Sequence, residues 1–189
     1  TPTLSTGAGT AGNVTVTGTT NGTTGGAAES LTVQAGTGTV TFTGNVGNNT
    51  NSTELEALTI TNAAATTFSG TVDLANALTQ TNAATGATTF TGAVSVGSAD
   101  LKGTSYAINN SFASAGTTAF TNSGVITKSA GTHITSTGAF STSGDVTLAA
   151  NITTTDTNLT IGGNLVIAEA ATPTLSTGAG TAGNVTVTG

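Results

Sequence analysis

The 189-residue chain lacks cysteine, methionine and tryptophan, and charged residues make up only 5% of it. Without cysteine it can form neither a disulfide framework nor a thiolate metal site. Its fixed cations are Lys102 and Lys128 alone, against a net charge of −6, so it has no basic cluster to neutralise nucleic-acid phosphates or an anionic membrane surface. No apolar run approaches the ~20 residues of a membrane span. We therefore expect neither a nucleic-acid partner nor a membrane span in this segment.

Threonine, glycine and small apolar residues dominate what remains. Disorder usually combines low hydrophobicity with high net charge, and this chain has neither. Thr, Val, Ile and Phe favour strands, and alternation with a period of two is clear in "VTVTG", "VTFTG" and "LTIT". The sequence therefore predicts an ordered all-β chain. The alternation assigns these residues to the interior: Val14, Val16, Val40, Phe42, Leu58 and Ile60. It assigns these to the opposite face: Thr15, Thr17, Thr41, Thr43, Thr59 and Thr61.

The first eighteen residues, "TPTLSTGAGTAGNVTVTG", recur without change at residues 172–189. Compositional bias does not produce an identity of this length, so we interpret the chain as part of a tandem array. Residues 1–171 would be one full period, and residues 172–189 the start of the next. On this interpretation residue 172 begins the same coil that residue 1 begins, one period further along.

Shorter units divide the long period. "FTGNV" (42–46), "FSGTV" (68–72) and "FTGAV" (90–94) are variants of one phrase, and "FTNSGVI" (120–126) and "FSTSGDV" (140–146) add a longer turn. Short strands that recur in this way predict a parallel β-solenoid of about seven or eight coils of 20–26 residues per period, stacked at roughly 4.8 Å. A β-sandwich would show a strand every ~8–12 residues. The phenylalanines of the five phrases are predicted to stack as one internal ladder.

Phrases such as "GATTFTGAVSVG" (86–97) and "GDVTLAANITTTDTNLTIGGNLVI" (144–167) resemble the coils of very large, repeat-rich bacterial surface proteins. The chain is similar to filamentous-haemagglutinin-like exoproteins and autotransporter passengers. The resemblance implies export to the cell surface, a right-handed parallel β-helix, and a non-enzymatic structural role in an adhesin or extracellular filament. It implies adjacent repeats or subunits as the main partners, and host or neighbouring cell-surface glycans as further ones.

The segment "GAGTAG", with Gly7, Gly9 and Gly12, matches the glycine fingerprint of dinucleotide-binding proteins. That fingerprint needs a helix directly after it, because the helix N-terminus holds the pyrophosphate. Here the strand pattern "NVTVTG" follows, and no acidic residue stands about twenty positions on in a βαβ context, since Glu29, 17 positions on, lies in a Gly/Ala-rich stretch. We therefore interpret the glycines as a solenoid corner and expect no cofactor.

Few residues could carry chemistry. His133 alternates with Ile134 in "THITSTG" and is expected on the surface. A Ser/His/Asp triad is not excluded by composition, because the chain has many hydroxyl side chains and Asp145. Glu54 and Glu56 share one face of a strand and are expected to be solvated, although they could bind a cation or act as paired carboxylates. We expect no catalytic, cofactor-binding or metal-binding residues.

Two alternatives to a structural role remain. The outward Thr-x-Thr pairs resemble the ice-binding rows of β-solenoid antifreeze proteins and could bind ice or glycan, but the unequal lengths of the coil steps argue against a regular array. A carbohydrate-active β-helix enzyme is the third hypothesis.

N-x-T triplets, which allow glycosylation after export, occur at several positions, including Asn13, Asn21, Asn48 and Asn158.

Overall fold

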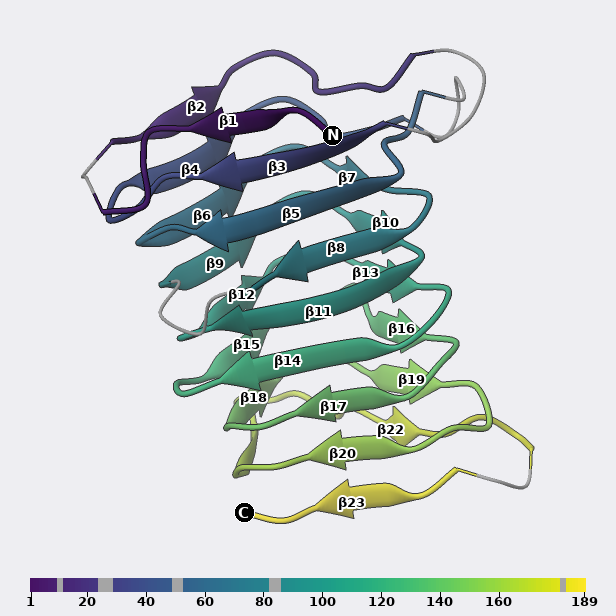
Figure 1. Ribbon diagram of the computed structural model, residues 1–189. Helices are drawn as coiled ribbons and strands as arrows, with labels where there is room; N and C mark the ends of the chain where they lie inside the picture. Colours follow the sequence, from purple (N-terminus) through teal and green to yellow (C-terminus); the bar gives the residue numbers. More distant parts are fainter. Residues whose placement is uncertain (10–11, 24–28, 49–52, 82–85, 181–182) are drawn as a thin grey trace.

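The computed structural model describes residues 1–9, 12–23, 29–48, 53–81, 86–180 and 183–189. The chain winds into a stack of turns with its N-terminus at one end and its C-terminus at the other (Figure 1). All strand pairs are parallel. The described residues contain no helix, and so none that could cross a membrane. The predicted all-β parallel solenoid is confirmed.

The strands form three sheets, named here by their strand numbers. The nine-stranded sheet comprises β1 (Thr3–Ser5), β3 (Ser30–Gln34), β5 (Ala57–Asn62), β8 (Ala77–Gln80), β11 (Ser98–Gly103), β14 (Thr118–Asn122), β17 (Phe140–Thr142), β20 (Leu159–Ile161) and β23 (Val185–Val187). The eight-stranded sheet comprises β2 (Val14–Val16), β4 (Thr39–Phe42), β6 (Ala65–Phe68), β9 (Ala87–Phe90), β12 (Tyr106–Ile108), β15 (Ile126–Lys128), β18 (Val146–Leu148) and β21 (Leu165–Ile167). The six-stranded sheet comprises β7 (Val72–Asp73), β10 (Val94–Val96), β13 (Phe112–Ser114), β16 (Ile134–Ser136), β19 (Ile152–Thr154) and β22 (Leu175–Ser176).

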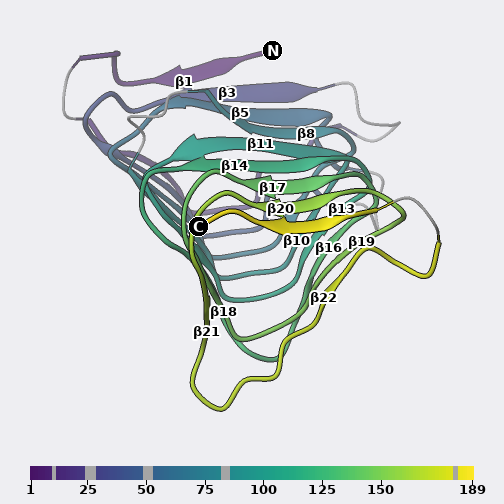
Figure 2. The same ribbon diagram turned by 90° about the horizontal axis from the view of Figure 1, so that it is seen from below.

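The chain visits the three sheets in a constant order, from the nine-stranded to the eight-stranded to the six-stranded sheet and back. Seen along the stack, the sheets form the three sides of a triangle (Figure 2). Six successive turns, from β5 to β22, have a strand on every side among the described residues. Before them the described residues continue the six-stranded side as single bridges, which are Thr20–Val46, Val46–Val72 and Leu55–Leu74. The complete turns are thus slightly fewer than the seven or eight predicted coils.

Side chains alternate between the interior and the outside, so equivalent residues of successive turns form straight rows. Leu31, Leu58 and Leu78 form one interior row of the nine-stranded sheet, and all three are buried. Each such side chain contributes about 1.5–3 kcal/mol by leaving water. Of the six residues predicted to be interior, five are buried and Val16 packs against them. The six threonines predicted to face outward are all at least partly exposed. The alternation therefore assigned both faces correctly.

The phenylalanines do not form one ladder. Phe42, Phe68 and Phe90 share a row of the eight-stranded sheet, with successive ring centroids 5.4 and 5.2 Å apart and ring planes 2° from parallel. Phe120 and Phe140, predicted to continue this row, lie instead in β14 and β17 of the nine-stranded sheet. The prediction is therefore correct for the first three rings and wrong for the last two.

The phenylalanines lie in different sheets because their phrases turn different corners of the triangle. In "FTGNV" the phenylalanine ends β4 and the chain turns toward the six-stranded side, which it meets at Val46. In "FTNSGVI" the phenylalanine lies in β14, and the chain turns toward the eight-stranded sheet, which it enters at Ile126. The two phrases look alike because every corner of the triangle needs the same small and polar residues.

Asparagine and aspartate side chains join successive turns at the corners. In each case Oδ1 of the residue before a strand or bridge accepts a hydrogen bond from a backbone N–H one turn further along. The pairs are Asn13 with Thr39 (2.9 Å), Asn45 with Thr71 (3.1 Å), Asp145 with Asn164 (2.8 Å), Asn151 with Thr174 (2.9 Å) and Asn158 with Asn184 (3.1 Å). These bonds supply partners for corner N–H groups that the strand ladders leave unpaired.

The glycine of the FTG phrase is required because successive corners lie against each other. A Cβ at Gly44 would lie 2.4 Å from the carbonyl oxygen of Gly18, and one at Gly92 would lie 2.2 Å from that of Gly70. Both distances are far shorter than any real contact of a Cβ atom, so a side chain would push the turns apart. This column of glycines permits the close stacking of the turns at that corner.

The two copies of the repeated phrase lie on different sides of the triangle. In the first copy "TLS" forms β1 of the nine-stranded sheet and "VTV" forms β2 of the eight-stranded sheet. In the second copy the same letters lie in β22 of the six-stranded sheet and β23 of the nine-stranded sheet. The prediction that residue 172 begins the same coil position as residue 1 is therefore wrong. The long period falls one side short of a whole number of turns.

Candidate functional site

The glycine fingerprint at the N-terminus lies at a corner between two strands. Gly7 has a φ of 102° and its N–H donates to Oγ of Ser5, 3.0 Å away. The element that follows is β2, a strand, as the sequence predicted. Residues 10 and 11 lie outside the described part of the chain. Among its described residues the segment leads into a strand, whereas a pyrophosphate would rest on a helix N-terminus.

His133 and Asp145 are not brought together. His133 is exposed on the approach to β16, and its Nδ1 accepts a bond of 3.3 Å from the N–H of Asn151. Asp145 precedes β18, and its Oδ1 accepts from both the N–H and the Nδ2 of Asn164 at 2.8 and 3.2 Å. Each side chain thus joins its own turn to the next at a different corner. The surface position predicted for His133 is confirmed.

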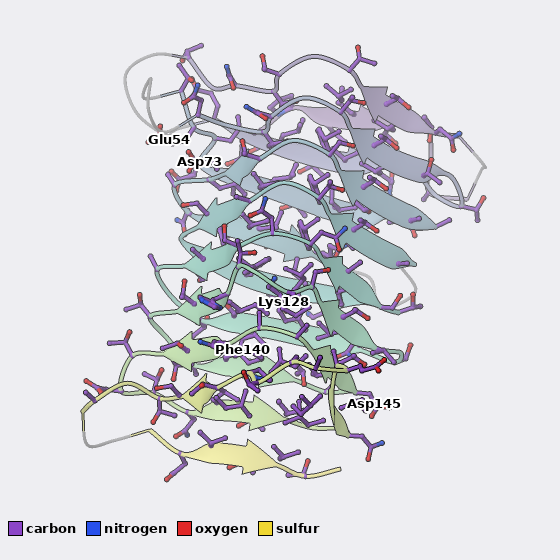
Figure 3. The ribbon with its side chains drawn as sticks, turned by 180° about the vertical axis from the view of Figure 1, so that it is seen from behind. Glu54, Asp73, Lys128, Phe140 and Asp145 are labelled. Carbon is purple, nitrogen blue, oxygen red and sulfur yellow. The ribbon has the colours of Figure 1, made fainter. Side chains whose placement is uncertain are left out.

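Three of the acidic residues, Glu54, Glu56 and Asp73, lie near the N-terminal end of the six-stranded side. Glu54 and Glu56 flank the buried Leu55 just before β5, not within a strand as predicted, and both are partly exposed. Glu56 accepts a bond of 3.0 Å from Nδ2 of Asn76. Glu54 instead lies close to Asp73 (Figure 3), and Oε2 of Glu54 is buried with no hydrogen-bond partner among the described residues.

Two adjoining hollows lie along this stretch. The larger, of about 350 Å³, is lined by Asn45, Gly47, Asn48, Thr71, Val72, Asp73, Ala93 and Ser95. The smaller, of about 200 Å³, has Glu54 in its wall and shares Asp73 and Ser95 with the first. In the described part of the chain, no group of three or more His, Cys, Asp or Glu side chains is placed to hold a metal ion. The two hollows thus have the carboxylates of Glu54 and Asp73 in their walls, and Ser95 lines both.

Lys128 is a buried cation that the sequence analysis did not single out. It ends β15 in an interior row, between Ile108 and Leu148 of the adjacent turns, and is 1% exposed (Figure 3). Its Nζ donates to the carbonyl of Ser129 at 2.8 Å and, at 3.4 Å, to Oγ1 of Thr132. Burial lowers the pKa of this amine. The sequence did contain a signal for this position. In "ITK" the isoleucine is buried, and a strand places the side chain two residues later, that of Lys128, on the same inward face.

The outer face of the eight-stranded sheet carries the most regular array of side chains. Its central row runs through Thr15, Thr41, Thr67 and Thr89, which are paired in register from turn to turn. A second row follows two residues later, and the bonds from the N–H groups of its members to the preceding turns continue the ladder. That row consists of Thr17, Thr43, Ser69 and Thr91.

The unequal coil steps do not disturb these rows. More of the chain separates Thr41 from Thr67 than separates Thr67 from Thr89, yet both pairs are in register. The strands thus keep their register although the lengths of chain that connect them differ. The sequence argument that unequal steps prevent a regular threonine array is therefore wrong. Ala107 interrupts the central row one turn further, and Thr127 and Thr147 continue it in the next two turns.

No protein-family model, curated protein or solved structure matches the chain. The basis for a functional proposal is therefore the fold itself, the regular outer faces and the two exposed ends of the stack.

Proposed function

We propose that the chain is a non-enzymatic structural repeat of a long β-solenoid rod, of the kind found in bacterial cell-surface filaments and giant adhesins. One observation carries the proposal. The first copy of the repeated phrase pairs with the turn that follows it, β1 with β3, and the second copy pairs with the turn that precedes it, β22 with β19. The same phrase can therefore have a neighbouring turn on either edge, which an array of repeats requires.

The two ends of the stack also support this role. Six large apolar residues are conspicuously exposed, and all but Val125 belong to the terminal strands: Leu4, Val166, Ile167, Val185 and Val187. The terminal strands β1, β21, β22 and β23 contain no charged residue and no proline. Charges and prolines are the usual protection of an open sheet edge. Unprotected edges with exposed interior rows favour another turn, or another copy, on each end.

The positions of the polar residues favour a structural role over a catalytic one. Asn13, Asp145 and Asn158 join turns at the corners, and the buried hydroxyls of Thr118 and Ser136 bond to each other at 3.1 Å. Side chains that hold the stack together in this way are not poised for catalysis. An extracellular location and cell-surface glycans as further partners belong to the same proposal and rest on the resemblance to surface exoproteins.

Self-association of the purified chain tests the proposal. We expect sedimentation velocity to show oligomers that lengthen with concentration, and aligned samples to diffract at about 4.8 Å along the fibre, the strand spacing. The variant Ile167→Lys/Val187→Lys places charges on exposed interior rows of β21 and β23, and we expect it to remain monomeric.

The control variant Thr127→Lys/Thr147→Lys adds the same charge to the outer face in the middle of the rod, where residues 127 and 147 are paired. It should associate like the unmodified chain. A chain that stays monomeric at all concentrations, or end variants that assemble as well as the control, would contradict a stacking repeat.

The threonine rows of the eight-stranded sheet favour a second candidate, binding of ice or of a glycan to that face. Hydroxyls and methyls in register over four turns present a flat, repeating surface. We expect thermal hysteresis or a glycan-array signal from the purified chain, and loss of that signal in Thr41→Lys/Thr67→Lys, which interrupts the array at its centre. Silence of the unmodified chain in both assays would reject this candidate.

A further inference from the structure

The repeated phrase has the same local structure in both copies although the copies occupy different corners. The N–H of Gly7 donates to Oγ of Ser5 at 3.0 Å, and the N–H of Gly178 donates to Oγ of Ser176 at 3.1 Å. The two glycines have φ angles of 102° and 90°. The turn after the first strand of the phrase is therefore a property of the phrase and not of the corner.

A second bond supports the same conclusion. Oγ1 of Thr6 donates to the carbonyl of Gly12 at 2.8 Å, and Oγ1 of Thr177 donates to that of Gly183 at 3.2 Å. In the first copy these residues lead from the nine-stranded to the eight-stranded side, and in the second from the six-stranded to the nine-stranded side. One phrase thus fits two corners of the triangle.

The two copies also use opposite edges of the phrase. Oδ1 of Asn13 accepts from the N–H of Thr39, one turn ahead, whereas the equivalent Asn184 donates its N–H to Asn158, one turn behind. The strands follow the same rule, since β2 pairs with β4 and β23 pairs with β20. Superposing the two phrases would give every strand of the phrase a neighbour on each edge.

We propose that β22 and β23 begin a further copy of the repeat, whose remaining turns stack on the end formed by β21, β22 and β23, and that each copy is seated one side of the triangle back from the copy before it. This inference rests on the proposed function, because it specifies how the repeats of the rod are stacked. The docking continues the three existing strand ladders, so the new interface is the interior of the rod extended. Three successive copies of the phrase therefore begin on three different sides, and the fourth returns to the first side.

The offset determines how outward features are distributed. The threonine rows of the eight-stranded sheet lie on one side within this chain, but in the next copy they would lie on the adjacent side. A rod of many copies therefore presents the same features on all three sides in rotation. Such a rod suits lateral contacts with cells or other filaments in every direction, and it does not form one long threonine face.

Disulfide formation between introduced cysteines tests the offset in the chain as it exists. The chain has no cysteine, so any disulfide comes from the introduced pair. With the offset, Thr186 lies beside Thr160 of β20. Without it, residue 186 would take the place equivalent to Thr15 in the eight-stranded sheet, beside Val166 of β21. We expect Thr160→Cys/Thr186→Cys to form the disulfide on mild oxidation and Val166→Cys/Thr186→Cys to remain reduced.

The pair Thr127→Cys/Thr147→Cys, which are neighbours in register in the middle of the rod, serves as the positive control for the chemistry. Cross-linking of the 166/186 pair, or failure of the 160/186 pair while the control pair reacts, would overturn the offset. The disulfide forms within one chain, whereas the proposed function is tested by association between chains. A monomeric chain with the 160/186 disulfide would retain the offset and reject the rod, and an assembling chain without it would do the reverse.

Discussion

Replacing Phe68 with alanine is expected to lower the free energy of unfolding by about 3–5 kcal/mol, the range for large aromatic side chains in cores. Phe68 is 2% exposed and its ring lies between those of Phe42 and Phe90, so the substitution opens a cavity and removes both stacking contacts. Each stacked pair adds about 0.5–1.5 kcal/mol beyond burial. Urea unfolding followed by circular dichroism measures the loss.

The matched control is Thr67→Ala, one residue away on the outer face of the same strand. A surface substitution of this kind is expected to change stability by no more than about 0.5 kcal/mol. Turns are stable only through their neighbours. The substitution at Phe68 should therefore also make the N-terminal turns unfold in a transition separate from that of the remaining turns. A loss no larger than that of the control would show that the three rings do not form a stack.

Replacing Lys128 with methionine is expected to stabilise the rod by about 1–3 kcal/mol, the range in which mutational data place the cost of burying a polar group. Methionine matches the length of the lysine side chain and fits between Ile108 and Leu148 in the same interior row. Among the described residues no carboxylate lies within ion-pair distance of the Lys128 amine. Thermal or urea unfolding at pH 7 measures the gain.

The gain should depend on pH. Burial lowers the pKa of Lys128 below its ordinary 10.5, so between the two values the unfolded chain binds a proton that the folded chain does not. The stability of the unmodified protein therefore rises with pH over that window, and the advantage of Lys128→Met shrinks. Burial, with the Asp100 carboxylate, raises the pKa of Tyr106 above 10.0, which lowers the stability of both proteins above pH 10 and cancels in the comparison.

The chain's other lysine supplies the control. Lys102 is 41% exposed and forms a surface ion pair of 3.5 Å with Asp100, and such pairs contribute about 0–1 kcal/mol. We expect Lys102→Met to leave the stability nearly unchanged or slightly reduced. A destabilised Lys128→Met would mean that the hydrogen bonds of the amine to Ser129 and Thr132 outweigh its burial.

Alternation in the sequence was enough to predict the interior and the outside. A strand places successive side chains on opposite faces, so Val40 and Phe42 had to be interior if Thr41 was outside, and the structure agrees. The same rule places Lys128 in the interior. This position was not predicted because lysine side chains are usually solvated. Corner residues were also recognisable, because glycine and asparagine mark turns.

The side on which a strand lies could not be predicted from the phrases. All three corners of the triangle need small and polar residues, so the phrase that begins at Phe90 and the phrase that begins at Phe120 look alike although they turn different corners. The phenylalanine that begins the phrase lies in the eight-stranded sheet at Phe90 and in the nine-stranded sheet at Phe120. The offset of the second phrase was missed for the same reason. Only the pairing of strands that are distant in sequence shows it.

The stacking of the turns determines how the rod responds to force. Hydrogen bonds between turns run along its length, and the two chain ends lie at opposite ends of the stack (Figure 1). Tension applied at the ends therefore opens one ladder at a time and does not shear whole sheets. Thr59 and Thr79 are neighbours in register although a whole turn of chain separates them. A freed turn of ~20 residues extends from about 4.8 Å to about 65 Å at ~3.3 Å per residue. A rod of such turns lengthens stepwise under load and dissipates energy before the chain itself is strained.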